Sequence, residues 1–238
     1  MNKLKKLKVY IYPAIALMLG ALFVAKFAGS TLLRMYIEFG IGDCKKIPIL
    51  CMAPQDYLMN PVINKEYIAG LVPYEFPKIK ISAPKGFTVV QEMIKKVYYK
   101  KGRRPQKGEV IYLLYQEPNF FINLFPPLRK HGISNDYEFI KRTMYAKEKN
   151  IKTITDAFFV IMKGIFIPDL GNQNTTVMAE LVSGDKKGFI NYNFDGPNNY
   201  FDCNIINSQG DFFKIYIKDI GATLSLNKVL AIISTVRK

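Results

Sequence analysis

The amino terminus carries the feature that most constrains this chain, a basic stretch followed by an uncharged apolar run. Four lysines lie between residues 3 and 8, and the apolar run extends from Val9 to Ala25. A membrane-spanning helix needs about 20 apolar residues, and the run reaches that length at Phe27 if the ammonium of Lys26 extends toward the outer headgroups. Lysines before the span predict a cytoplasmic amino terminus. The sequence therefore predicts a single-pass protein of the cell membrane whose main domain is extracytoplasmic, on the periplasmic side.

A cleaved signal peptide is the main alternative, because it also begins with a basic stretch and an apolar core. Ala28 and Ser30 supply small residues for a cleavage site, but the apolar core is long for a signal peptide. The residues from Thr31 to Phe39 also remain compatible with a helix, which favours an uncleaved signal anchor. A buried helix of a soluble protein is a third interpretation, which the clustered lysines disfavour.

The rest of the chain divides into a connector and one domain. We expect residues 1–30 to form the cytoplasmic tip and anchor, and residues 31–76 to form a membrane-proximal helix and a proline-rich connector with a short helix near residues 64–71. Residues 77–238 are long enough for a single α+β domain with a sizeable core. The predicted fold is thus a transmembrane helix followed by an antiparallel sheet packed against helices.

Charge restricts the classes of partner. The chain has 34 Lys and Arg against 19 Asp and Glu, and the part after residue 30 remains basic. Outside the cytoplasm, a basic surface meets anionic lipid, cell-wall polymers or acidic proteins rather than nucleic acid. The alternative is that the positive charge only maintains solubility. We therefore expect the lipid bilayer as a partner through Val9 to Phe27, an envelope protein as a second partner, and no nucleic acid.

Three cysteines remain in the predicted extracytoplasmic part. Cys44 and Cys51 would close a short loop as a disulfide in an oxidising compartment, which leaves Cys203 as a buried thiol. Pairing of Cys203 with Cys44 or with Cys51 stays open at the level of sequence. The spacing matches no zinc motif, so we expect no metal.

Extended and helical patterns alternate through the domain. Strands are expected at Lys78–Ser82, Phe87–Gln91 and Phe120–Leu124, and a hairpin is expected to pair Ile94–Tyr99 with Glu109–Tyr115. Asn135 with Glu138 predicts the start of one helix. Thr153 predicts the start of another, in which Ile154, Phe158 and Ile161 share a face.

The last quarter of the chain is the clearest pattern. Four extended runs separated by Gly-containing turns predict an antiparallel meander: Val177–Val182, Phe189–Phe194, Tyr200–Asn207 and Phe212–Ile217. An amphipathic helix should follow from Ser225, with an apolar stripe of Leu226, Val229, Leu230, Ile233 and Val236.

This order of elements resembles the PsbP-like fold, named for an extrinsic subunit of photosystem II. The resemblance rests on the strand and Pro-x-Gly-Phe opening at Lys80 to Phe87, the central helix at Asp136 to Ala146, and the closing meander and helix that end at Lys238. It covers roughly residues 77–238. It implies a non-catalytic accessory or assembly role and assigns no catalytic residue.

The densest cluster of basic and aromatic residues lies in the predicted hairpin. Its basic and aromatic residues are candidates for binding an anionic surface or a partner: Lys95, Lys96, Tyr98, Tyr99, Lys100, Lys101, Arg103, Arg104 and Lys107. Basic residues near an anionic membrane each add attraction. The alternative is a solvated loop whose charge prevents edge pairing.

Catalytic patterns are weak by comparison. His131 is the only histidine, and it stands beside Lys130 and Gly132 without a local carboxylate pair to orient it as a general base. No glycine-rich phosphate loop follows a strand, so we expect no cofactor and no catalytic residue. The sequence favours a membrane-anchored binding domain, an accessory or assembly component of an envelope complex. The alternatives are an envelope hydrolase, and a domain that binds anionic lipid or cell-wall polymer.

Overall fold

The structure is a computed structural model that describes residues 29, 31–32, 34–39, 44–93, 96–99, 109–167, 175–194 and 198–238. For residues 92–93 and 96–99 the structure describes the backbone only. The predicted membrane span from Val9 to Phe27 lies outside the described residues. Within the described residues, every helix is too short or too polar to cross a bilayer.

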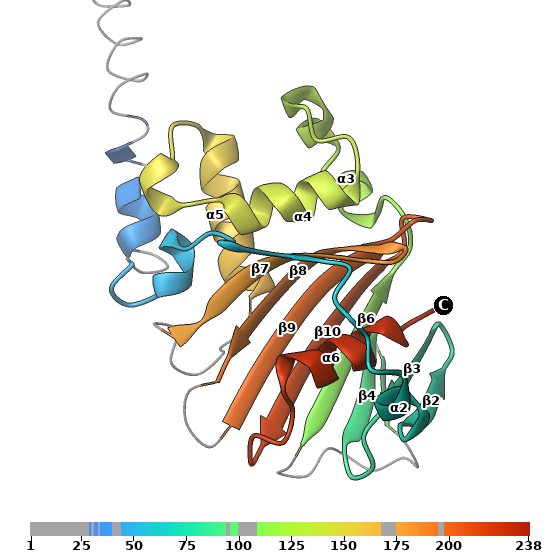
Figure 1. Cartoon of the computed structure of the whole chain (residues 1–238). Helices are drawn as coiled ribbons and strands as arrows, with labels where there is room; N and C mark the ends of the chain where they lie inside the picture. The colour runs from blue at the N-terminus through green and yellow to red at the C-terminus, as the bar shows by residue number, and fades with distance from the viewer. Residues whose placement is uncertain are drawn as a thin grey trace, which may run out of the picture.

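The chain forms an α+β fold around one large sheet (Figure 1). Eight strands follow the order β1-β7-β8-β9-β10-β6-β4-β5. Their bounds are β1 Asp56–Met59, β4 Thr88–Met93, β5 Lys96–Tyr99, β6 Val110–Gln116, β7 Val177–Ser183, β8 Lys186–Asn193, β9 Asn198–Asn207 and β10 Phe212–Ile220. The sheet is mixed rather than antiparallel as predicted, because β1 runs parallel to β7 and β4 runs parallel to β6.

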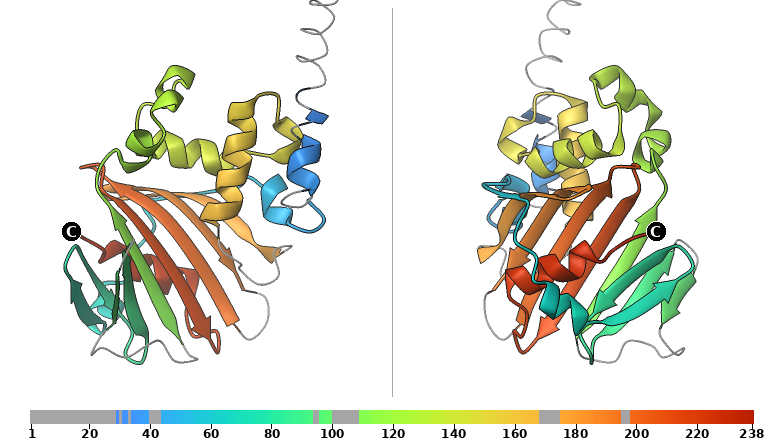
Figure 2. Two further views of the ribbon diagram at one scale, coloured as in Figure 1. Left: turned by 180° about the vertical axis from the view of Figure 1, so that it is seen from behind. Right: turned by 45° about the vertical axis from the view of Figure 1, so that its right-hand side comes forward.

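One face of the large sheet is covered by α6 (Leu226–Ser234), α2 (Lys65–Ala69) and the small antiparallel sheet of β2 (Val72–Phe76) and β3 (Ile79–Ala83) (Figure 2). Side chains alternate across a strand, so Phe213, Ile215 and Ile217 of β10 enter this core. The hydroxyl of Ser225 caps α6 by accepting from the Lys228 N–H. The predicted amphipathic C-terminal helix is confirmed.

The opposite face carries the helical layer, which packs over one end of the sheet and leaves the other end open (Figure 2). Its members are η1 (Pro48–Cys51), α3 (Phe120–Leu124), η3 (Pro126–His131), α4 (Asp136–Tyr145), η4 (Glu148–Asn150) and α5 (Ile154–Phe166). The predicted helix starts are confirmed, because the side chains of Asn135 and Thr153 cap α4 and α5. Of the predicted apolar face of α5, Phe158 and Ile161 are partly buried against the core, whereas Ile154 is largely exposed. The fully buried residues of α5 include Phe159 and Val160, which were not predicted.

Phe120–Leu124, predicted as a strand, is the helix α3. Asn119 adopts a left-handed conformation (φ 64°), which ends the extended chain after β6. The Asp136 carboxylate then accepts hydrogen bonds from the Phe121 and Ile122 N–H groups at 3.0 and 3.2 Å. A buried carboxylate from α4 thus satisfies the free N–H groups of a short helix, which an apolar pentapeptide does not reveal by itself.

The predicted hairpin between residues 94–99 and 109–115 is wrong in its pairing. β5 pairs with β4 at the sheet edge, with Tyr99 opposite Val90, whereas β6 pairs with the other side of β4. Alternating patterns indicate strands but do not say which strands are neighbours. The connector likewise contains β1, which the proline-rich sequence does not indicate, although its predicted short helix is confirmed as α2.

The C-terminal meander is confirmed, since β7, β8, β9 and β10 pair in sequence order and antiparallel. Glycines with positive φ lie in two of its turns, Gly184 between β7 and β8 and Gly210 between β9 and β10. The last strand of the meander, β10, forms the floor of the site described next together with its neighbour β6.

Candidate functional site

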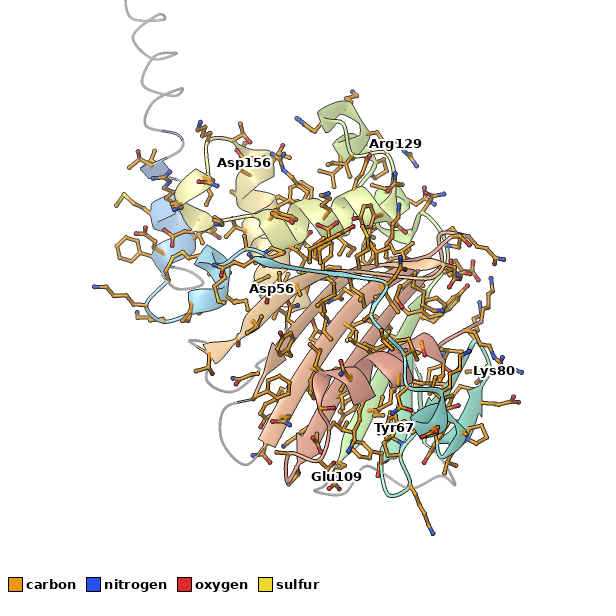
Figure 3. All side chains as sticks on the ribbon, viewed as in Figure 1. Asp56, Tyr67, Lys80, Glu109, Arg129 and Asp156 are labelled. Atoms are coloured by element: carbon orange, nitrogen blue, oxygen red, sulfur yellow. A yellow bond between two sulfur atoms is a disulfide. The ribbon has the colours of Figure 1, made fainter. Side chains whose placement is uncertain are left out.

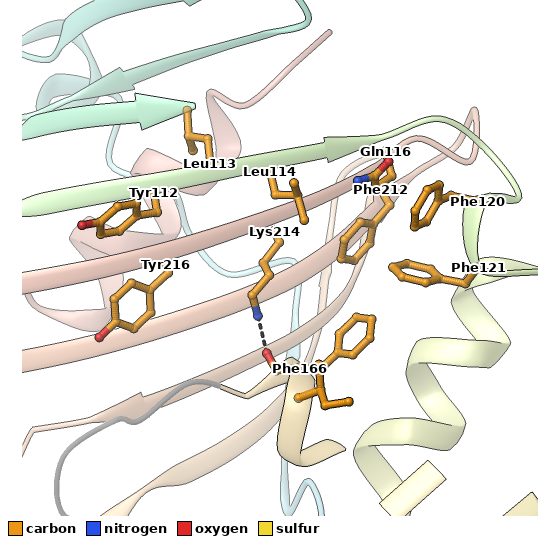
Figure 4. Close-up of a pocket in the computed structure, with 11 residues that line it drawn as sticks. Tyr112, Leu113, Leu114, Gln116, Phe120, Phe121, Phe166, Phe212, Lys214 and Tyr216 are labelled. Atoms are coloured by element: carbon orange, nitrogen blue, oxygen red, sulfur yellow. Dashed lines mark hydrogen bonds between the residues drawn. The ribbon is translucent and has the colours of Figure 1, made fainter. Parts of the chain in front are cut away.

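A pocket opens where the helical layer meets the uncovered part of the large sheet (Figure 4). We call it the sheet pocket, and its volume is about 540 Å³. Side chains of β6 and β10 form its floor, and α3 and the end of α5 form its walls. The principal lining residues are Tyr112, Leu114, Gln116, Phe120, Phe121, Ile165, Phe166, Phe212, Lys214 and Tyr216.

The floor follows from the register of β6 and β10. Lys214 pairs with Leu114, and Tyr216 pairs with Tyr112, so alternate residues of both strands face the pocket side. The Tyr112 and Tyr216 rings lie 6.1 Å apart between centroids. The two antiparallel strands therefore present a tyrosine pair and an aliphatic side chain on a fixed surface.

Aromatic rings form the closed end of the pocket. The Phe121 ring lies 5.1 Å from the rings of both Phe212 and Phe166, measured between centroids. Phe121 also stacks on Phe139 at 4.9 Å in the core of the helical layer. Edge-to-face and stacked contacts of this kind hold large side chains in place, so the wall belongs to the packed core of the helical layer.

Lys214 is the cation of the sheet pocket, and its ammonium is fully engaged. Its Nζ donates to the carboxylate of Asp202 at 2.6 Å, to the Asn204 side-chain oxygen at 3.4 Å and to the Phe166 carbonyl. An ammonium has three donors, and three acceptors are present. Lys214 therefore has no donor left for a ligand in this arrangement.

Asp202, the partner of Lys214, is completely buried within β9. Its second oxygen accepts from the Asn204 amide at 2.8 Å and from the Asn191 amide at 3.4 Å. The side-chain oxygen of Asn191 has no hydrogen-bond partner among the described residues. The pair of charges thus sits in a polar network under the pocket, and what the pocket offers to a ligand is mainly aromatic and aliphatic surface.

The sequence-predicted binding residues fall outside this site. Of the predicted binding segment from Lys95 to Lys107, the structure describes only the backbone of β5. The side chains of this segment lie outside the described part of the chain. His131 is exposed at the end of η3. The sheet-pocket residues were not predicted from the sequence, although Lys214, a charged residue between the apolar residues Phe213 and Ile215, was a visible signal.

The predicted pairing of Cys44 with Cys51 is confirmed. The two residues form a disulfide with Cα atoms 5.7 Å apart, and Cys203 is a buried free thiol. The Glu148 carboxylate lies beside the bridge, 2.7 Å from the Cys44 sulfur. The bridge therefore lies where the start of the connector contacts η4 of the helical layer.

A buried lysine, Lys163 of α5, lies inside the helical layer. Its Nζ donates to the carbonyl oxygens of Met52 and Ala146, at 2.5 and 2.8 Å. Burial, with a smaller contribution from the positive charge of Lys147, lowers the pKa of Lys163 from 10.5 to about 7. The unfolded chain therefore binds more protons than the folded chain between these two values, and stability should rise with pH across that window.

Lys163→Met should reduce this pH dependence. One proton contributes at most about 1.4 kcal/mol of unfolding free energy per pH unit, so the slope between pH 7 and 10 should fall by up to that amount. Urea unfolding of the full-length protein in mild detergent at several pH values measures the slope. Lys130→Met, at an exposed position on η3, is the control that should leave it unchanged. An unchanged slope in Lys163→Met would show that the lysine keeps its ordinary pKa in the fold.

Comparison of the chain with models of known protein families and with curated proteins yields no match. The resemblance to the PsbP-like fold therefore stays a prediction from the sequence. Function therefore has to be inferred from the residues of the site itself.

Proposed function

We propose that this chain is a single-pass membrane protein whose extracytoplasmic α+β domain acts by binding, as an accessory or assembly component of an envelope complex. The proposed binding site is the sheet pocket. Pockets of about 300 to 1,000 Å³ with mostly aromatic lining are typical of ligand sites. Aromatic pockets also receive the anchor side chains that dominate protein interfaces.

The chemistry of the lining favours binding over hydrolysis. Among the described residues, the polar side chains that line the sheet pocket are Gln116, Lys214 and two tyrosines, without a histidine, a serine, a cysteine or a carboxylate. Acyl or phosphoryl transfer needs a nucleophile with a base to activate it. A large apolar side chain of a partner protein is the occupant that fits a wall of phenylalanines and a neutralised lysine.

Two observations support the proposed extracytoplasmic location of the domain, the amino-terminal sequence and the disulfide. Residues 3–8 and 9–27 have the composition of a signal anchor. A Cys44–Cys51 bridge suits an oxidising compartment. These observations support a domain displayed outside the cytoplasm.

Ile165 at the rim of the sheet pocket provides the test. Its side chain is 68% exposed near the end of α5, whereas Ile154 at the start of the same helix is 76% exposed and does not line the sheet pocket. We expect a photo-crosslinking amino acid at position 165 to capture a specific envelope protein in cells that make the chain. The same group at position 154 should capture none.

A matched pair of substitutions completes the experiment. Ile165→Glu should abolish recovery of the partner from a mild-detergent membrane extract, whereas Ile154→Glu should retain it. Equal recovery with both variants would exclude the sheet pocket as the interface. Absence of any stoichiometric protein with the unmodified chain would contradict the accessory role itself.

A further inference from the structure

The helical segment of residues 31–32 and 34–39 exposes an apolar stripe. Leu32, Met35, Tyr36 and Phe39 follow the spacing i, i+3, i+4, i+7 and therefore share one side of the helix. Their exposed fractions are 63%, 44%, 72% and 83%. So much exposed apolar and aromatic surface on one helix marks a contact with something other than water.

The other side of this segment is attached to the domain. Ile37 is 1% exposed and belongs to the core of the helical layer, together with Ile49 and Phe159. The Arg34 guanidinium donates to the backbone carbonyl of Lys149 in η4. The segment is thus held with its apolar stripe facing outward, at the end of the molecule that carries the helical layer (Figure 1).

A basic cleft lies in the same helical layer. Residues of η3, α4, η4 and α5 enclose a volume of about 790 Å³, and its basic lining consists of His131, Arg142, Lys147, Lys149 and Lys152. Figure 3 labels Asp156, the acidic residue of this lining, within the helical layer. The cleft and the apolar stripe are connected through Lys149, whose carbonyl accepts from Arg34.

The acid in the cleft does not neutralise its lysines. Asp156 pairs with Arg142 at 3.0 Å, and its other oxygen accepts from the Thr153 hydroxyl and from the Lys152 and Thr153 N–H groups. Within the described part of the chain, Lys147, Lys149 and Lys152 form no ion pair. Three positive charges are therefore available to an anionic group.

We infer that the apolar stripe and the basic cleft together form a membrane-docking surface, with the stripe in the interfacial region of the bilayer and the cleft on phosphates of anionic phospholipid. The inference rests on the membrane anchor of the proposed function. Leu32 follows closely after Phe27, the end of the predicted span. Even a fully extended chain would cover only about 18 Å between them, so the stripe starts close to the headgroups.

Apolar insertion and electrostatic attraction reinforce each other at this surface. Interfacial helices bind by burying an apolar face near the headgroups, and tyrosine and phenylalanine suit that depth. Each lysine near an anionic leaflet contributes attraction, and three of them shift a docking equilibrium by roughly 100-fold. The surface would hold the helical layer on the bilayer and leave the open part of the sheet turned away for a partner.

The chain contains no tryptophan, so a single introduced tryptophan reports on its own surroundings. We expect Phe39→Trp in the full-length protein, reconstituted in vesicles containing phosphatidylglycerol, to show blue-shifted emission and strong quenching by brominated lipids. Val62→Trp is the matched control, because Val62 is 90% exposed and lies outside the helical layer. Its emission should resemble tryptophan in water, with little quenching.

The charge contribution is measured on the same reporter. The triple variant Lys147→Glu, Lys149→Glu, Lys152→Glu, made in the Phe39→Trp protein, should lose the increase in tryptophan quenching that phosphatidylglycerol causes over phosphatidylcholine alone. Reversal of three lysines outside the helical layer, Lys65, Lys85 and Lys218, should retain that increase.

Vesicle flotation separates the two possible failures. Weak and equal quenching in the Phe39→Trp and Val62→Trp proteins, when both float with the vesicles, overturns the docking surface while leaving the anchor. Protein that does not float with the vesicles overturns the anchor and, with it, the docking surface. Strong quenching in the Phe39→Trp protein that is the same with and without phosphatidylglycerol, and the same after the triple substitution, overturns the role of the basic cleft.

Discussion

Gly188→Ala is expected to unfold the domain. Gly188 lies in β8 opposite Ile205, and a Cβ atom at this position would stand 2.0 Å from the carbonyl oxygen of Asn204 in β9. The obstruction is backbone of the neighbouring strand β9, inside the sheet, so no side chain can move aside to relieve it. We expect a loss of at least about 4 kcal/mol, which is a large part of the roughly 5 to 15 kcal/mol that stabilises an ordinary domain and enough to unfold one at the lower end of that range.

Gly164→Ala is the control for this prediction. Gly164 lies within α5, and an added Cβ there would meet only the Leu50 side chain at 3.5 Å, an ordinary contact. Alanine favours a helix over glycine by about 1 kcal/mol, so this variant should be as stable as the parent or more so. Urea unfolding followed by circular dichroism compares them. A Gly188→Ala variant within about 1 kcal/mol of the parent would contradict the close approach of β8 and β9.

The parts of the fold that local patterns encode were the parts that the sequence predicted. The meander from β7 to β10 has clear alternation and turn residues with positive φ, such as Gly184 and Gly210. The starts of α4 and α5 carry capping side chains at Asn135 and Thr153. In each case a signal within a few residues determines the structure, without reference to a distant partner.

The wrong predictions concern segments whose structure depends on residues distant in sequence. The run Phe120–Leu124 forms a helix because the Asp136 carboxylate, distant in sequence, binds its N–H groups. The strands β5 and β6 were recognised, but both pair with β4 instead of with each other. Tertiary contacts overrode local preference in both places, and a single sequence does not contain the neighbour relations.

The polar network under the sheet pocket was predictable in part. Four polar residues stand between apolar neighbours in the last three strands: Asn191, Asp202, Asn204 and Lys214. The register of the meander places Asn191 opposite Asp202 and Lys214 opposite Asn204. Polar residues on one face of three adjacent strands indicate a buried polar cluster. The walls of the pocket come from α3 and the end of α5, and their placement depends on the helical layer that the sequence did not position.

Asp202→Ala is expected to destabilise the domain by about 3 to 5 kcal/mol, since removal of one partner leaves a desolvated charge. Asp202 is completely buried, and the Lys214 side chain is 21% exposed. After the substitution the ammonium would retain only the Phe166 carbonyl and the distant Asn204 oxygen. Urea unfolding of the full-length protein in mild detergent measures the loss.

The double variant Asp202→Leu, Lys214→Met distinguishes a structural role from recognition. Replacement of a buried ion pair by apolar residues of similar size is often neutral for stability, so this variant should recover the part of the Asp202→Ala loss that comes from the unpaired lysine. The part that comes from the Asn191 and Asn204 amides, which still lack their acceptor, should remain. If the pair only supports the floor of the sheet pocket, the double variant should still be crosslinked from position 165 to the same partner. Recovered stability with lost crosslinking would instead show that Lys214 leaves Asp202 to contact the partner, and the sheet pocket would then be a site for an anionic group rather than an apolar side chain.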